Sequence, residues 1–400
     1  MSLQVVQSRI RGFISLTAHP DGCAANVREQ IEVIERGGLE GSIGTALVVG
    51  STTGYGLASA LTTCFGYGAK TLGVGFEKEP TDDKTGTAGW YNAAEASRLA
   101  HERGLTYRTI NGDAFDPATK QEVIDALKAG DFGPVDVFIY SLAAPRRKGA
   151  DGTVWNSVLK PIGEPYHGKA FDLRSETVSE ASIEAANDEE IESTVKVMGG
   201  EDWMDWIHAL ADAGVFAPDA RTIAFSYIGP EVSAPIYRRG TIGKAKEHLE
   251  QTAAAADALM KQTAGAGAGA WVSVNKSVVT QASSAIPAVP LYMSVAFRVM
   301  KDQGVHEGVI EQIVRLFHDH AGPGLQPEVD EGGRIRLDDR EMADSVQTVV
   351  AESWKNLSNE TLPILADWDG YKHDFQKLFG FGVDGVDYDA PTEVNRPLNA

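Results

Sequence analysis

The chain has 400 residues, of which 43% are hydrophobic and 23% are charged, so it contains enough apolar material for a large folded core. It carries 36 basic and 56 acidic residues, a net charge of −20. This charge argues against a general nucleic-acid-binding protein, because phosphate binding needs a positive face.

The cysteine content and the apolar runs indicate the cellular location of the protein. The two cysteines, Cys23 and Cys64, favour a reducing, cytoplasmic location. The first 13 residues mix polar and apolar types, so we expect no signal peptide. The most apolar stretch, 285–299, is interrupted by two prolines and an arginine, so we expect no membrane span.

Helical and strand patterns alternate along most of the chain. A first helix contains Ile31, Val33 and Ile34 and ends at Gly37. Six short apolar runs, typical of strands buried on both faces, follow at 46–49, 71–76, 107–110, 135–140, 222–227 and 270–274. Helical patterns lie between them at 57–65, 91–103, 118–129 and 242–263. This order predicts an α/β fold with a doubly wound, Rossmann-type parallel sheet and helices on both faces.

Two stretches depart from this alternation. Residues 145–169 are rich in Gly, Pro, Lys and Arg and are predicted to form a long loop, and 180–213 is predicted to contain two helices. We expect one enlarged domain with its core at 44–290, on which an N-terminal extension (1–43) and a C-terminal extension (291–400) pack.

A glycine-rich turn follows the first strand and opens a helix. The motif has the spacing G-x-x-x-G-x-G and comprises Gly50, Ser51, Thr52, Thr53, Gly54, Tyr55 and Gly56. Glycines here allow a tight turn, and the N–H groups at the helix start can hold a pyrophosphate. The motif therefore predicts a dinucleotide site.

An acidic residue at the end of the second strand narrows the choice of dinucleotide. Glu77 lies 21 residues beyond Gly56, where a carboxylate accepts the ribose 2′-OH and repels a 2′-phosphate. NADH is therefore expected and NADPH disfavoured. The alternative interpretation is that the glycine motif forms a tight turn that binds no ligand and that Glu77 is an ordinary exposed glutamate.

Residues after the next two strands extend the predicted crevice. Asp113 and Ala114 follow the third strand, where an acid can meet the adenine edge. Ser141 and Leu142 follow the fourth, where small residues let the nicotinamide ribose lie close. For either pair, a plain structural turn is an equally good interpretation.

A tyrosine and a lysine follow the fifth strand. Tyr237 and Lys246 are separated by eight residues. An ammonium group near a phenol lowers its pKa, which is about 10 in a free tyrosine, and strengthens it as a proton donor. Lys244 is a rival for the cationic role, and an ordinary loop tyrosine with a solvated lysine is the plain alternative.

The glycine turn near residue 50, the Tyr-x8-Lys spacing and the segment 279–287 together resemble the trans-2-enoyl-ACP/CoA reductases of the FabV/TER family, enlarged relatives of the short-chain dehydrogenase/reductases. Segments 12–20 and 334–339 are also similar, so the resemblance covers nearly the whole chain. It implies NADH-dependent reduction of the C2=C3 double bond of enoyl thioesters in fatty acid synthesis.

The resemblance also implies roles for individual residues. Tyr237 would be the proton donor, Lys246 would bind the cofactor and tune Tyr237, and Tyr227 would contact the substrate carbonyl region. The NADH site would be lined by residues 50–55, Phe76, Glu77, Asp113, Ala114, Ser141, Leu142, Lys246, Val278, Val279 and Thr280. No metal is implied.

Partners and rival functions stay open at this point. Arg146-Arg-Lys148 and Arg238-Arg239 are basic patches that can meet acyl carrier protein or the phosphates of coenzyme A, or can be ordinary surface arginines.

Trp203 and Trp206 are expected in the core, with an acyl-chain wall as the minor alternative. We expect a monomer. The rivals are a carbonyl-reducing short-chain dehydrogenase and a non-catalytic NAD(H) sensor.

Overall fold

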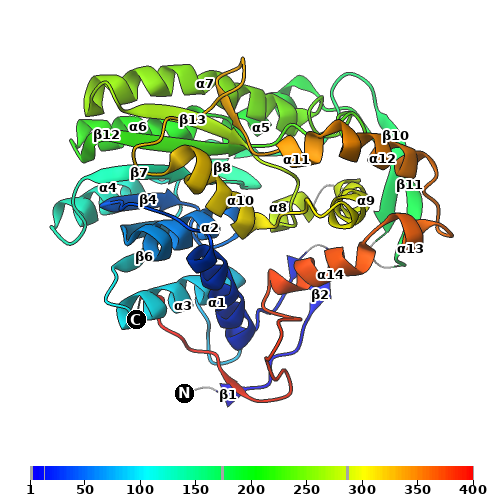
Figure 1. Cartoon of the computed structure of the whole chain (residues 1–400), viewed down its shortest axis with the longest axis horizontal. Helices are drawn as coiled ribbons and strands as arrows, with labels where there is room; N and C mark the ends of the chain where they lie inside the picture. Colours follow the sequence, from blue (N-terminus) through cyan, green and yellow to red (C-terminus); the bar gives the residue numbers. More distant parts are fainter. Residues whose placement is uncertain (1–2, 13, 173–174, 285–287, 400) are drawn as a thin grey trace.

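A parallel β-sheet forms the centre of the computed structural model, which describes residues 3–12, 14–172, 175–284 and 288–399 (Figure 1). In this part of the chain its seven strands lie in the order β14-β13-β12-β7-β4-β5-β6, and each neighbouring pair is parallel. The strands are β4 (Thr45–Val49), β5 (Lys70–Gly75), β6 (Tyr107–Asn111), β7 (Val135–Tyr140), β12 (Phe216–Ser226), β13 (Gly269–Val274) and β14 (Arg334–Arg336). The first six match the predicted strands, so the doubly wound parallel sheet is confirmed.

The chain changes its direction across the sheet between β4 and β7. From β4 it proceeds outward through β5 and β6, and from β7 it proceeds the opposite way through β12, β13 and β14. In such sheets ligands bind outside the carboxyl ends of the strands at this switch point. The predicted glycine turn follows β4 and therefore lies at this point.

Helices cover both faces of the sheet, because each strand buries side chains on both sides. In β4, Ala46 and Val48 contact one apolar cluster, whereas Leu47 and Val49 contact another. The first cluster includes residues of α1 (Pro20–Arg36), α2 (Gly54–Leu61), α3 (Ala88–Glu102) and α10 (Val309–Leu316). The second includes residues of α4 (Pro117–Lys128), α6 (Glu201–Asp212) and α7 (Thr241–Ala264), and α5 (Asp188–Met198) packs on α7.

A third apolar cluster joins the C-terminal part of the chain to the loop that carries Tyr237. Its main helices are α9 (Val289–Asp302), α12 (Asp344–Lys355) and α14 (Trp368–Lys377). The remaining short elements are η1 (Thr62–Gly66), α8 (Gln281–Ser284), η2 (Phe317–Ala321), α11 (Asp339–Met342) and α13 (Leu362–Leu365).

Three features differ from the sequence-based expectations. The stretch predicted as a long loop contains the hairpin β8 (Arg146–Lys148) and β9 (Val154–Asn156) and the start of a second hairpin, β10 (Tyr166–Asp172) and β11 (Thr177–Ile183). The helix predicted at 57–65 is α2 followed by the π-helical segment η1. The first helix, α1, is capped by His19 and ends before Gly37, as expected. β14 was not predicted, because its three residues alternate arginine with one buried isoleucine.

Two short strands near the two ends of the chain pair with each other (Figure 1). β1 (Leu3–Gln4) pairs with β15 (Thr392–Glu393), and the hairpin of β2 (Ile10–Arg11) and β3 (Ile14–Ser15) follows β1. Parts of the similar segments 12–20 and 279–287, namely Phe13 and 285–287, lie outside the described residues. Among the described residues, each helix is too short or too polar to cross a membrane.

Candidate active site

The turn after β4 leaves no room for side chains at two of its glycines. A Cβ atom on Gly50 would lie 2.0 Å from the carbonyl oxygen of Ser141, and one on Gly56 would lie 1.9 Å from that of Gly50. Gly50 and Gly54 also have positive φ angles of 82° and 54°, which other residues rarely adopt. The structure therefore requires glycine where the motif has it.

The start of α2 faces this turn with uncapped N–H groups. The N-cap residue, Thr53, makes no side-chain cap hydrogen bond. By contrast, the N–H groups of Gly50 and Ser51 both donate to the carbonyl oxygen of Val74, each at 2.9 Å, which holds the turn against β5. Free N–H groups at a helix start favour an anion, so the turn fits the pyrophosphate of a dinucleotide.

Glu77 lies immediately beyond β5 with its carboxylate held in place. One oxygen accepts a hydrogen bond from Thr52 Oγ1 at 2.5 Å, and the other accepts one from Thr87 Oγ1. The carboxylate packs against Gly89 in the first turn of α3, where a Cβ would lie 2.1 Å from Oε1. Its negative charge is thus fixed at the strand end from which the ribose contact was predicted.

The loop after β7 and the loop after β13 meet the glycine turn. Leu142 Cδ2 lies 3.3 Å from where a Cβ on Gly50 would be, and Thr280 Cγ2 lies 3.7 Å from the equivalent point on Gly54. Tyr55 ties the two regions together, because its hydroxyl donates to the Lys276 carbonyl oxygen at 2.9 Å.

The other predicted cofactor residues differ in exposure. Phe76 is 77% exposed, whereas Val278 and Val279 are each 6% exposed. Asp113 accepts the N–H of Phe115 at 3.0 Å, and the Ala114 carbonyl accepts hydrogen bonds from Lys120 and Trp206.

Tyr237 lies in a compact turn that packs on the start of α7. Its carbonyl oxygen accepts the N–H groups of Gly240 at 3.0 Å and Gly243 at 3.1 Å. A Cβ on Gly243 would lie 2.0 Å from the Arg238 carbonyl oxygen, so the close packing depends on that glycine. The side chain is 8% exposed, and its hydroxyl has no hydrogen-bond partner among the described residues.

Burial raises the pKa of Tyr237, and the positive charge of Arg238 opposes the rise. The sequence-based expectation that the nearby lysine lowers this pKa is therefore wrong for the protein without ligands. The reason is that the loss of water around the phenolate outweighs the nearby positive charge. The phenol consequently keeps its proton at neutral pH, as a proton donor must.

The two candidate lysines of α7 lie in different environments. Lys246 is partly buried, and its ammonium group donates to the Phe225 carbonyl oxygen at 2.9 Å, at the end of β12. Burial lowers its pKa to about 8, and Glu250 opposes that shift. Lys244 is 52% exposed and pairs with Glu247 at 2.8 Å. The geometry favours Lys246 for the cofactor.

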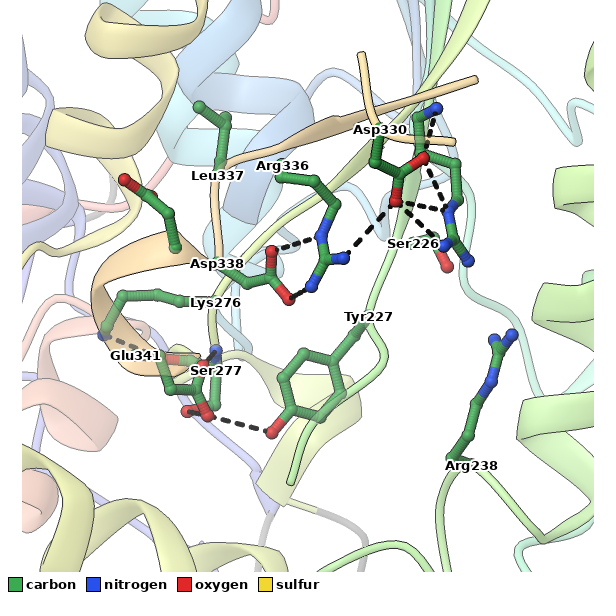
Figure 2. Close-up of polar contacts among 12 residues, drawn as sticks. Ser226, Tyr227, Arg238, Lys276, Ser277, Asp330, Arg336, Leu337, Asp338 and Glu341 are labelled. Atoms are coloured by element: carbon green, nitrogen blue, oxygen red, sulfur yellow. Dashed lines mark hydrogen bonds and ion pairs between the residues drawn. The ribbon is translucent and has the colours of Figure 1, made fainter. Parts of the chain in front are cut away.

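Tyr227 belongs to a buried polar cluster that the sequence analysis missed (Figure 2). Its ring packs edge-on against that of Tyr237, with centroids 4.8 Å apart and an interplanar angle of 77°. Its hydroxyl donates to Glu341 Oε1 at 3.1 Å, and Tyr292 and Ser277 donate to the same carboxylate. Ser277 follows the end of β13, a position at which sequence reasoning can look for site residues, whereas Glu341 lies on the short helix α11, which the sequence did not predict.

Ion pairs engage one residue of the first predicted basic patch and both residues of the second. Arg147 is 8% exposed and pairs with Asp205 at 3.0 Å, so only Arg146 and Lys148 of its patch are exposed. In the other patch the arginines are also paired, Arg238 with Glu250 and Arg239 with Glu231.

Two curated relatives match nearly the whole chain. The chain is 52% identical to an enoyl-acyl-carrier-protein reductase (NADH) of Flavobacterium johnsoniae, with 97% of each chain covered. It is 51% identical to a protein of the same name from Serratia proteamaculans, with 96% of each covered.

Solved structures match over nearly the whole chain. The Clostridium acetobutulicum trans-2-enoyl-CoA reductase in complex with NADH has a TM-score of 0.95 at 38% identity, covering 99% of this chain and 100% of that one. The Treponema denticola trans-2-enoyl-CoA reductase in complex with NAD has a TM-score of 0.91 at 45% identity, covering 98% of each.

Three family models match successive parts of the chain. The trans-2-enoyl-CoA reductase catalytic region matches residues 84–321, and the NAD(P)H binding domain of trans-2-enoyl-CoA reductase matches 5–82. A third model, described as an enoyl reductase FAD binding domain, matches 329–392.

The lysines and arginines of 329–392 are engaged in ion pairs within the described part of the chain. In this segment Ile335 and Leu337 are fully buried, and every lysine and arginine already pairs with a carboxylate. These cations are Arg334, Arg336, Arg340, Lys355, Lys372 and Lys377. No unpaired cation is left there to hold a flavin diphosphate among the described residues. The chain belongs to the family of NADH-dependent trans-2-enoyl thioester reductases, as its sequence predicts.

Proposed function

We propose that Tyr237 is the proton donor with which this enzyme reduces the C2=C3 double bond of a trans-2-enoyl thioester. Bound NADH supplies the hydride that C3 of the substrate accepts. Negative charge then develops on the thioester oxygen, to which the Tyr237 hydroxyl donates a hydrogen bond. Because this bond strengthens as the charge grows, it stabilises the transition state more than the ground state. Tyr237 gives its proton to the enolate, C2 is protonated as the thioester re-forms, and solvent returns a proton to the Tyr237 phenolate.

The proposal rests on one observation: Lys246 and Tyr237 each contact a residue at the carboxyl end of β12. Lys246 bonds to Phe225 within that strand, and Tyr227, just beyond the strand end, contacts the Tyr237 ring. In this proposal Lys246 donates to the nicotinamide ribose of a dinucleotide whose pyrophosphate lies on the glycine turn. Tyr227 lines the substrate carbonyl region.

An NADH-oxidation assay tests this function against its two rivals. We expect oxidation with crotonyl-CoA and none with a 3-ketoacyl-CoA. Preference for the ketoacyl substrate would favour a carbonyl-reducing short-chain dehydrogenase. NADH binding without turnover of any enoyl thioester would favour a sensor.

Acyl carrier protein is the proposed carrier of the substrate. The curated relatives at 51–52% identity are named for that carrier, whereas the solved structures at 38–45% identity are named for coenzyme A. Arg146 and Lys148 remain exposed on β8, which follows the predicted nicotinamide-ribose residues at the end of β7. If they steer an acidic carrier, raising salt slows reaction with crotonyl-ACP more than with crotonyl-CoA. Equal salt dependence would contradict this carrier assignment.

The proposal includes a single folded domain that acts as a cytoplasmic monomer. The pairing of β1 with β15 supports one unit, and both cysteines are free and buried, as a reducing compartment allows. Light scattering after size-exclusion chromatography tests the monomer, for which we expect a mass near 42.8 kDa.

A further inference from the structure

Glu341 is a buried carboxylate surrounded by hydrogen-bond donors. It is fully buried on α11, and its Oε1 accepts from Tyr292 at 2.5 Å, from Ser277 Oγ at 3.0 Å and from Tyr227 at 3.1 Å. Its Oε2 accepts the N–H of Ser277 at 2.6 Å. Four donors satisfy an ionised carboxylate, whose two oxygens accept several bonds and donate none.

A buried cation balances part of this charge. Lys276 is 2% exposed, and its ammonium group donates to the carbonyl oxygens of Ser277 and Glu307, each at 2.9 Å. Burial lowers the pKa of Lys276 to about 8, and the charge of Glu341 opposes this shift. Figure 2 places Lys276 and Ser277 beside Glu341, with Tyr227 between this cluster and Arg238.

The hydrogen of Tyr227 is committed to Glu341. A phenol has one hydrogen to donate, so while this bond lasts the Tyr227 oxygen offers other groups only its lone pairs. Tyr237, whose ring Tyr227 contacts edge-on, keeps its own hydroxyl without a partner among the described residues. The hydroxyl hydrogen of Tyr227 is therefore already bonded to Glu341, whereas that of Tyr237 is available to a substrate.

We propose that Glu341 is a positioning residue for the reduction: it fixes the Tyr227 ring, and the ring in turn fixes Tyr237, which alone donates to the thioester oxygen. This inference rests on the proposed function of Tyr237. It assigns a role in the reaction to the C-terminal segment that the third family model matches.

The substitution Glu341→Gln tests the role because glutamine has nearly the same shape as glutamate but carries a hydrogen-bond donor in place of one acceptor oxygen. The Ser277 N–H is part of the backbone and cannot turn, so the glutamine carbonyl must take the place of Oε2. Its NH2 group then faces the three hydroxyls that bonded to Oε1, and Tyr227 loses the acceptor for its hydrogen.

The matched control is Tyr292→Phe. It removes another hydroxyl that donates to the same oxygen, yet it leaves the bond between Tyr227 and Glu341 in place. If Glu341 acted only as a structural core residue, both variants would lower the melting temperature and neither would lower kcat selectively.

The experiment measures kcat with crotonyl-CoA and the Kd of NADH for the wild type, Glu341→Gln, Tyr227→Phe, the double variant and Tyr292→Phe. We expect Glu341→Gln to lower kcat ~10-fold to 100-fold, as misplacement of a catalytic group does, with the Kd of NADH unchanged. The double variant should be no slower than the slower single variant, because both changes break the same connection. Tyr292→Phe should lower kcat clearly less than Glu341→Gln, because the bond between Tyr227 and Glu341 remains.

Other outcomes would overturn either the positioning role of Glu341 or the proposed function itself. Wild-type kcat in Glu341→Gln, or effects that multiply in the double variant, would overturn the positioning role. If Glu341→Gln does not fold, Tyr227→Phe and Tyr292→Phe decide, and equal kcat in these two variants would overturn the role. A wild type without turnover of crotonyl-CoA or crotonyl-ACP would instead overturn the proposed function, and this inference with it.

Discussion

The ammonium group of Lys246 donates to the carbonyl oxygen of Phe225 at 2.9 Å, which joins the second turn of α7 to the end of β12. Burial lowers the pKa of this lysine to about 8, well below its ordinary value. Lys246 is therefore mostly cationic at pH 7 and mostly neutral at pH 9, so its interaction with the cofactor is expected to depend on pH.

NADH affinity of the wild type should fall as the pH rises through 8. Loss of the charge weakens the hydrogen bond to the ribose, so we expect the Kd of NADH to rise roughly fivefold between pH 7 and pH 9. In Lys246→Arg the rise should be absent, because a guanidinium stays charged in this range. Fluorescence titration of NADH measures both curves. Lys244→Ala is the control and should follow the wild type, and the same slope in the arginine variant would exclude Lys246 as the cause.

Tyr237→Phe should lose turnover and keep cofactor binding. Removing one donor to a developing oxyanion typically costs ~10²–10³ in kcat. The ring and its contact with Tyr227 stay in place, so the Kd of NADH should not change. Steady-state and binding measurements on the same preparation separate the two effects. Turnover at the wild-type rate would remove Tyr237 from the mechanism.

Glu77→Gln should relax the preference for NADH over NADPH. The carboxylate is fixed at the end of β5 by Thr52 and Thr87, where its charge repels a 2′-phosphate. Without that charge, the ratio of kcat/KM for NADPH to that for NADH should rise ~10-fold, which corresponds to about 1.4 kcal/mol. The exposed neighbour Glu79 provides the control, since Glu79→Gln should leave the ratio as it is. An equal rise in the control would mean that the total negative charge of this region, and not the carboxylate of Glu77, sets the preference for NADH.

Trp203→Ala should destabilise the protein without changing its substrate preference. Trp203 is fully buried in the cluster formed with α4 and α7, and its indole N–H donates to Thr222 Oγ1 at 2.9 Å. Replacing a buried tryptophan with alanine typically costs about 3–5 kcal/mol. Urea unfolding measures this loss. A changed acyl-chain preference in the folded variant, measured across enoyl-CoA lengths, would revive the acyl-wall interpretation.

The sequence predicted the central sheet and the turn at its switch point because both depend on local patterns. Strands buried on both faces appear as short apolar runs, and Gly50 and Gly56 are required by backbone contacts under 2.1 Å. The cofactor loops could be predicted for the same reason, since each follows a strand at one edge of the sheet.

The rest depends on contacts between distant parts of the chain. β14 is recognisable only through its pairing with β13, and the hairpins at 146–183 have no clear alternation. Glu341 lies 114 residues from Tyr227, and an acid in an acidic segment gives no sign that it is buried. The expected lowering of the Tyr237 pKa was wrong because sequence gives the nearby charges but not the extent of burial.

A crystal structure with NAD⁺ and an unreactive acyl thioester tests the central claim most directly. We expect the Tyr237 hydroxyl about 2.7 Å from the thioester oxygen, with the Lys246 ammonium group within hydrogen-bonding distance of the nicotinamide ribose and Tyr227 still bonded to Glu341. A thioester oxygen bonded to Tyr227, with Tyr237 turned away from it, would contradict the account.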